Sequence, residues 1–146
     1  MPLTYSPLDY DAFKKLAVQK IKGAKILFKN GCYNDSYYLA GYAIECALKA
    51  CYCKSINAQT FPPAKNIYDK LYQHGLNKLL DVSGVKSQFD QEVSNNIKLQ
   101  TNWNVTKDWT YESRYANSIK KTEAEALIKA ITANRVGILT WIKKVW

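Results

Sequence analysis

The sequence predicts an all-α fold: an antiparallel up-down four-helix bundle with one additional short helix. Three observations lead to this class. Apolar residues recur at helical spacing along most of the 146-residue chain. Residue types that start and stop helices flank the periodic stretches. Strand-like alternation, internal repeats and low-complexity tracts are absent from the sequence. The length fits a single domain over residues 1–146.

The first helix is expected to begin at Ser6-Pro7 and to close at Gly31. Serine is a favoured N-cap, and proline is tolerated at the first helical position. Glycine after the last turn is a typical helix end. A short turn, Asn30–Asn34, then joins this helix to the next, which predicts an antiparallel hairpin. The inward-facing residues are expected to be Phe13, Ala17, Ile21, Ala24 and Phe28.

The second helix, expected over Tyr33–Ile56, is apolar on most of its faces. Asn34 or Asp35 is expected to cap its start. Between Asp35 and Lys49 the one charged side chain is Glu45. Such a helix must be surrounded by other helices or by a partner subunit. A buried carboxylate needs a partner cation, or a site that uses it.

Weaker signals follow along the second half of the chain. Ile67–Leu80 and Ser87–Leu99 are expected to be helices, with a loop before the first and a turn at Gly84 after it. Gln100–Tyr115 lacks periodicity and is expected to be a long ordered loop, a type that is often functional. A capping box, Thr122-x-x-Glu125, opens the last helix, which is expected to extend to Trp141.

The net charge of +9 is concentrated toward the two ends of the chain. Residues 1–30 hold six lysines against two aspartates, and residues 101–146 hold eight basic residues against four acids. Such ends suit nucleic acid or another anion, and the alternative is a solvated lysine face. No stretch is apolar enough to span a membrane, and the N-terminus lacks the pattern of a secretory signal. We therefore expect a cytoplasmic protein without membrane association.

The four cysteines, at positions 32, 46, 51 and 53, lack the paired spacing of a zinc site. We expect the three in the second helix to be small core residues and expect no metal site. The sequence also lacks a glycine-rich phosphate loop, and no cofactor is predicted.

Three residues are candidates for chemistry: His74, Arg114 and Glu45. His74, the sole histidine, suits proton transfer near neutral pH, or it is a helix residue that bonds to its neighbours. Arg114 lies in Trp109-x4-Arg114-Tyr115, where an arginine between aromatic residues can hold a phosphate or stack on a base. The alternative, which we favour, is that Arg114 is the cation paired with Glu45.

The run from Gly31 to Ala50, GCYNDSYYLAGYAIECALKA, resembles the HEPN (higher eukaryote and prokaryote nucleotide-binding) family. His74-Gly75-Leu76-x2-Leu79 and Trp109-x4-Arg114-Tyr115 are similar to stretches of its bacterial members. The resemblance covers roughly Phe13 to Trp141. It implies a four-helix bundle with a short extra helix, usually a homodimer. Many members are metal-independent ribonucleases of toxin–antitoxin, CRISPR or other defence systems.

The family's ribonucleases use an Arg-x4–6-His motif at the start of the last helix, with two copies meeting across the dimer. Here Arg114 is followed at those spacings by Ile119, Lys120 and Lys121. Lysine is a poor substitute for histidine in proton transfer at its ordinary pKa. The resemblance therefore implies binding in place of the usual cleavage.

We expect a homodimeric module that binds nucleotide, RNA or a protein such as a cognate nucleotidyltransferase, in a toxin–antitoxin or defence system. The binding residues expected are Trp109, Arg114, Tyr115, Lys120 and Lys121.

The alternative is a divergent metal-independent ribonuclease in which His74 and Arg114 converge and Glu45 orients one of them. A third interpretation is structural dimerisation through the apolar second helix.

Overall fold

A computed structural model describes residues 8–56 and 75–146. This part of the chain contains seven α-helices, one 3-10 helix and no strand, which confirms the predicted all-α class. In chain order the elements are α1 (Tyr10–Lys29), α2 (Tyr33–Ser55), α4 (Gly75–Val82), α5 (Lys86–Asn95), α6 (Ile97–Thr106), the 3-10 helix η1 (Tyr111–Tyr115), α7 (Lys121–Thr132) and α8 (Ile138–Val145).

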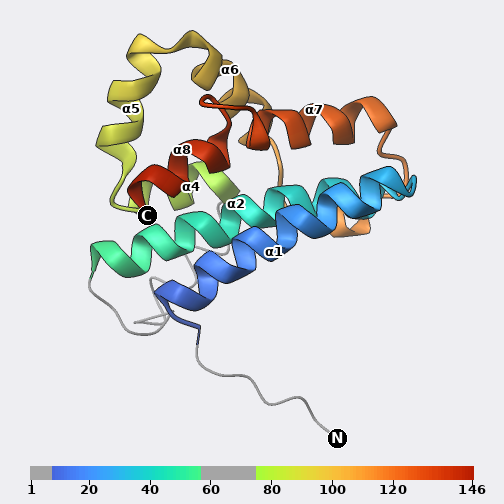
Figure 1. The fold of residues 1–146 in the computed structure, drawn as a ribbon, viewed down its shortest axis with the longest axis horizontal. Helices are drawn as coiled ribbons and strands as arrows, with labels where there is room; N and C mark the ends of the chain where they lie inside the picture. Colours follow the sequence, from blue (N-terminus) through green and yellow to red (C-terminus); the bar gives the residue numbers. More distant parts are fainter. Residues whose placement is uncertain (1–7, 57–74) are drawn as a thin grey trace, which may run out of the picture.

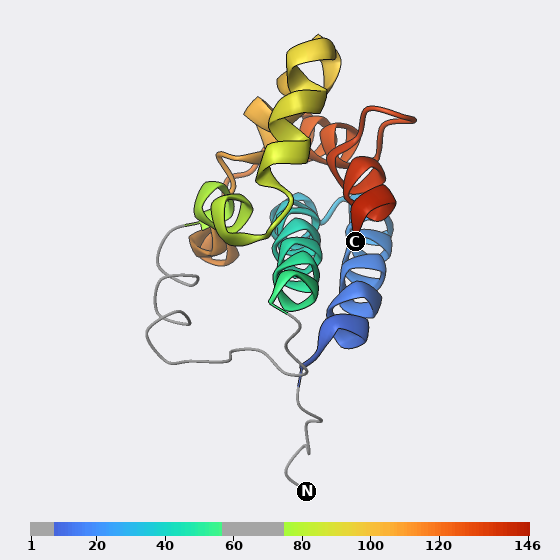
Figure 2. The same cartoon turned by 90° about the vertical axis from the view of Figure 1, so that its left-hand side faces the viewer.

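Helices α1 and α2 form the predicted antiparallel hairpin and lie side by side (Figures 1 and 2). Helix α1 begins later than expected, because Asp9 is its N-cap and its carboxylate accepts a hydrogen bond from the Ala12 amide at 2.8 Å. Ser6 and Pro7 lie outside the described residues. The helix ends as predicted, with Gly31 in the left-handed region at φ 77°.

Helix α2 is the centre of the fold. Figure 2 shows α1 and α8 to one side of it and α4 to the other, and α2 also contacts η1 and α7. Thirteen of its residues are buried, from Ser36 near its start to Cys53 near its end. Of the two predicted kinds of cover for this apolar helix, other helices or a partner subunit, the structure shows the first, supplied by α1, α4, α7 and α8.

The expected caps of α2 are wrong. The helix begins at Tyr33, with Cys32 in the N-cap position and no side-chain cap. The Asn34 Oδ1 instead accepts a hydrogen bond from the Ile119 amide at 2.8 Å. This bond attaches the chain before α7 to the start of α2. Both segments adjoin the candidate site.

The predicted helix over 87–99 is interrupted at Asn96. Asn96 has an extended backbone (φ −142°, ψ 94°) and its Oδ1 accepts from the Leu99 amide at 3.2 Å, so it caps the start of α6. Helix α6 then occupies the first part of the predicted loop over 100–115, and η1 occupies the last part. Leu99, Trp103 and Thr106 are buried at helical spacing, which the polar residues between them hide in the sequence.

The predicted last helix over 122–141 is two helices. Its capping bond lies two residues earlier than expected, because the Glu123 carboxylate accepts from the Lys120 amide at 3.3 Å. Glu125 instead pairs with Lys129 at 2.8 Å. The chain turns between α7 and α8, where Arg135 adopts a positive φ of 66°. Helix α7 ends before this residue, at Thr132, because its C-cap Ala133 has an extended ψ of 141°.

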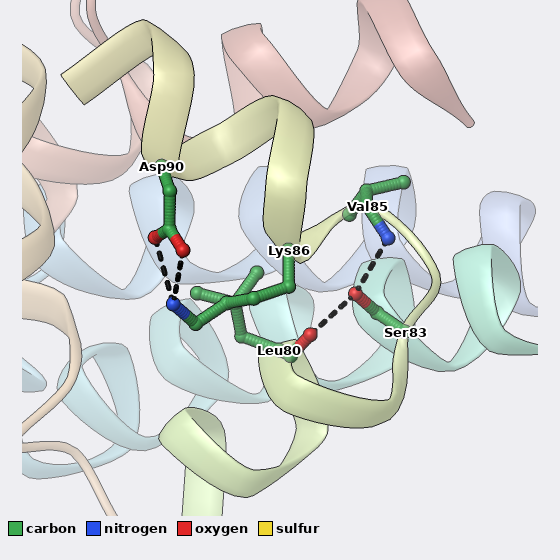
Figure 3. A network of polar contacts seen from close by, with 5 residues as sticks. All are labelled: Leu80, Ser83, Val85, Lys86 and Asp90. Carbon is green, nitrogen blue, oxygen red and sulfur yellow. Dashed lines mark hydrogen bonds and ion pairs between the residues drawn. The ribbon is translucent and has the colours of Figure 1, made fainter. Parts of the chain in front are cut away.

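The turn between α4 and α5 is the network in Figure 3. The buried Ser83 hydroxyl donates to the Leu80 carbonyl at 2.7 Å and accepts from the Val85 amide at 3.2 Å. Lys86 pairs with Asp90 at 2.6 Å on the first turns of α5. Gly84 lies in this turn, as predicted, with φ 85°.

Only the last part of the helix expected over 67–80 is described. Leu76, Leu79 and Leu80 of α4 are buried. Ile67 and Leu71, and the loop expected before them, lie outside the described residues. No helix in the described ranges is long and apolar enough to cross a membrane.

Replacing Asn96 by alanine tests the break between α5 and α6. The substitution removes the side-chain acceptor at the start of α6, so we expect the free energy of unfolding to fall by about 1 kcal/mol. The measurement is chemical denaturation. Asn95→Ala is the control, because Asn95 caps no helix start. Equal losses for the two variants would contradict the capping role.

Candidate nucleic-acid interface

Trp109 anchors the chain between α6 and η1 on the surface of α2. Its indole is 1% exposed and lies directly over Gly41, where any Cβ would overlap the ring. The Tyr38 ring stacks against the indole with a centroid distance of 6.0 Å. The indole Nε1 has no hydrogen-bond partner among the described residues. Packing therefore holds Trp109 in place, and Gly41 is what allows it.

The stacking continues across α2. Tyr42 stacks on Tyr38 at 5.8 Å, one helical turn further along, and the Lys20 Nζ of α1 lies 5.8 Å from the Tyr42 ring centroid. We call Trp109, Tyr38 and Tyr42 the aromatic ladder. Because its central ring, Tyr38, already stacks on both of its neighbours, the ladder supports the site and leaves base stacking to other residues.

The exposed part of the site is η1. The Arg114 guanidinium carbon lies 5.1 Å from the Tyr111 ring centroid and 4.8 Å from the Tyr115 ring centroid. A side-chain hydrogen bond with Tyr115 raises the pKa of Arg114 above its ordinary value. Tyr115 is 74% exposed and Tyr111 is 39% exposed. We call these three residues the η1 patch, a cation held between two accessible aromatic rings.

Lys120 and Lys121 follow the η1 patch along the chain and are both exposed. The bond between Asn34 and Ile119 fixes the position of this segment beside the α1–α2 turn. Acidic side chains are exposed nearby: Asp108 before η1, Glu112 in η1 and Glu123 in the first turn of α7. Burial, and then Glu123 and Asp108, raise the pKa of the half-buried Tyr37. The cations of η1 and of the start of α7 therefore face solvent together with acidic side chains.

The predicted ion pair between Glu45 and Arg114 is wrong. Glu45 pairs with Lys49 at 3.1 Å, and the two side chains are 12% and 3% exposed. The pair lies within one helix at i,i+4 spacing, so the cation is supplied without any alignment between elements. Arg114, in contrast, is exposed and its guanidinium is available to a ligand. Glu45 is therefore not part of the η1 patch.

His74 lies outside the described residues, so its convergence with Arg114 stays a prediction. The residue after it, Gly75, borders a cavity of about 390 Å³ between the start of α4 and the chain entering η1. The described residues lining this cavity are Gly75, Leu76, Asn77, Lys107, Trp109, Thr110, Tyr111 and Glu112. Trp109 is therefore both part of the wall of this cavity and a member of the aromatic ladder.

Sequence reasoning missed Gly41 as a packing residue and Tyr111 as the second ring on Arg114. A signal existed for each. A glycine inside a helix costs helix stability relative to alanine, so its presence indicates a packing reason such as the close approach of another group. Tyr111 lies three residues before Arg114, the spacing at which side chains of one turn meet.

The three cysteines of α2 are buried, as predicted. Burial raises the pKa of Cys46 and that of Cys51 to about 12, and it also raises the pKa of Cys53. Among the described residues no group of three or more metal-ligating side chains gathers.

The chain matches a known protein family. The HEPN domain family matches residues 10–144, nearly the whole length. The protein therefore belongs to the HEPN family, as the resemblance in the sequence implied. No curated protein and no solved structure matches the chain significantly. Membership supports a nucleotide- or RNA-related module in general, and HEPN domains are commonly dimeric.

Gly41→Ala tests the anchoring of Trp109. The added methyl group overlaps the buried indole, so we expect the free energy of unfolding to fall by about 2 kcal/mol, together with a change in tryptophan fluorescence.

Gly23→Ala is the matched control for that substitution. Gly23 also lies inside a helix, and its Cβ would make an ordinary contact with Leu39 Cδ1 at 3.4 Å. Alanine there should preserve or raise stability because it favours the helix. Equal destabilisation by the two variants would contradict the close approach at Gly41.

Thiol titration tests the burial of the cysteines. With pKa values of about 12, Cys46 and Cys51 hold about one thiolate in ten thousand at pH 8. We expect the folded protein to react with Ellman's reagent at one thiol, the exposed Cys32, and the unfolded chain to react at all four. Rapid labelling of a second thiol in the folded state would contradict this arrangement.

Proposed function

We propose that this HEPN protein binds RNA or nucleotides through the η1 patch together with Lys120 and Lys121. The observation that carries the proposal is the exposed Arg114 guanidinium between the Tyr111 and Tyr115 rings. The described part of the chain presents no other arginine with aromatic rings on it. Arg135, the remaining arginine, lies in the α7–α8 turn.

The chemistry of the patch matches that of a nucleotide. A guanidinium donates two parallel hydrogen bonds to a phosphate, and tyrosine packing fixes its orientation in advance. The open face of Tyr115 is available for a base to stack on. Lys120 and Lys121 add positive charge without demanding a particular geometry. These contacts read phosphates and ring faces, so the proposed binding has little dependence on sequence.

We also propose that the protein is a homodimer, because HEPN domains are commonly dimeric. We also propose a toxin–antitoxin or defence context, with a cognate nucleotidyltransferase as protein partner, which follows from the family's bacterial members. Light scattering at micromolar concentration tests the dimer, and co-purification tests the partner. A monomer at that concentration would remove the dimer from the proposal.

Binding through η1 is tested with a labelled single-stranded RNA and fluorescence anisotropy. Arg114→Gln removes the bidentate donor, so we expect the dissociation constant to rise about tenfold or more. Tyr115→Ala should weaken binding by a similar factor, because one base loses its stacking partner. Arg135→Gln is the matched control, since it removes the chain's other arginine away from the patch.

Two results would contradict this role for the patch. One is a wild-type protein that does not bind RNA at low salt. The other is an equal loss for Arg114→Gln and Arg135→Gln, which would reflect net charge alone.

A divergent ribonuclease is the second candidate function. It is favoured by the cavity beside η1, which borders Gly75, the residue after His74. His74 would act as the proton-transferring group and Arg114 would hold the phosphate. Incubation of single-stranded RNA with wild-type protein and with His74→Ala decides between the functions. Cleavage that the substitution leaves unchanged, or that neither protein shows, removes this candidate.

A further inference from the structure

The outer face of α1 carries a row of lysines that the η1 patch does not use. Lys15, Lys22, Lys25 and Lys29 are all exposed, and we call them the α1 lysine row. The opposite face of the same helix packs into the core through Phe13, Ala17, Ile21 and Ala24. Helix α1 lies at the front of Figure 1 and at the edge of the molecule in Figure 2, and none of the other helices within residues 8–56 and 75–146 covers its outer face.

The charge of this row is uncompensated. From Ala12 to Asn34 the chain contains no acidic residue. None of the ion pairs between described residues includes a lysine of the row. Lys22 and Lys25 lie three residues apart, and Lys25 and Lys29 lie four apart, so like charges meet on adjacent turns and disfavour the helix. An anionic partner would remove that repulsion.

The spacing of the row matches a polynucleotide backbone. Lys15, Lys22 and Lys29 recur every seven residues, which is about 10.5 Å along a helix. Phosphates of a stacked strand recur about every 3.4 Å, so about three nucleotides separate successive lysines. The whole row, about 21 Å long, spans about six nucleotides.

The row leads toward the η1 patch at one end of the bundle. Lys29 is the last residue of α1, and the turn into α2 follows it. The chain before α7 lies beside that turn (Figure 1), held by the bond between Asn34 and Ile119. Lys120, the N-cap of α7, and Lys121, its first residue, directly follow Ile119. Positive side chains therefore continue from α1, around the turn, to the segment that follows η1.

We infer that the α1 lysine row is a second phosphate-binding surface, which holds a single RNA strand whose other part lies on the η1 patch. The inference rests on the proposed function and extends it, because it makes the ligand a polynucleotide longer than the η1 patch alone can hold. The exposed Val18 and Ile26, at 44% and 52%, lie among the lysines and contact the sugars of the bound strand.

The test replaces all four lysines of the row by glutamine and measures binding of RNA at several salt concentrations. For a strand of about twelve nucleotides, we expect the slope of log K against log salt to become shallower by about 3, and the affinity at low salt to fall about tenfold or more. For a strand of about four nucleotides, which the η1 patch can hold alone, we expect little change.

The matched control replaces Lys54, Lys78, Lys98 and Lys129 by glutamine. These four exposed lysines belong to α2, α4, α6 and α7, and the control has the same net charge as the α1 variant. We expect it to keep most of the wild-type salt slope. Circular dichroism and the melting temperature establish that both variants fold, since the lysines are exposed and outside the core.

Three outcomes overturn the inference. The first is an equal loss of slope in the α1 variant and the control. The second is an equal loss for the short and the long strand. The third is competition by polyglutamate of equal charge as effective as that by RNA, which would indicate an acidic protein as the partner. Failure of the proposed function is distinct: Arg114→Gln would then bind the short strand as wild type does.

Discussion

The contact between Trp109 and Gly41 is the constraint on which the candidate site depends. A helix as apolar as α2 needs cover on every side, and most of that cover comes from other helices. Beside Gly41 the cover is a single indole from an irregular segment. The absence of a side chain at Gly41 lets the indole approach the helix backbone. Because Trp109 is fixed there, η1 begins two residues later at a defined place and presents Arg114 to solvent.

The Glu45 carboxylate of α2 is neutralised by a lysine of the same helix, so Arg114 remains available for function. Glu45 needs a cation because its carboxylate is mostly shielded from water. Lys49, one turn further along the same helix, supplies it, and burial of both partners makes the pair strong enough to persist. An arginine from another element would have been consumed by that pairing. Because α2 itself supplies the cation for Glu45, Arg114 can stay exposed.

The sequence predicts some elements well because their signals are local and repeated. The α1–α2 hairpin has long periodic stretches and a short glycine turn, and each supports the same answer. The region from 87 to 115 lacks this agreement. Asn96 breaks a stretch that contains apolar residues at helical spacing, and polar residues mask the buried face of α6. The buried face of α6 is set by tertiary packing, such as that between Phe89 and Trp103.

The candidate site shows the same division. Arg114 and Tyr115 were predicted because an arginine beside aromatic residues is a chemical signal within a few residues of sequence. The role of Gly41 depends on Trp109, 68 positions away in the chain, and no local pattern links them. The Glu45 partner shows the opposite case. The cation that pairs with it is a lysine four residues away, which needs no tertiary alignment, and the distant Arg114 is not involved.

The placement of the two positive surfaces restricts how one strand can touch both. Helix α1 lies on one side of α2, and the path across α2 passes the aromatic ladder and the Glu45 carboxylate beyond it. A phosphate backbone on that path would meet tyrosines already stacked on each other, with few cations to neutralise it. Around the α1–α2 turn, Lys29, Lys120 and Lys121 supply charge. A polyanion therefore binds more favourably around the α1–α2 turn, at the end of the bundle, than on the path across α2.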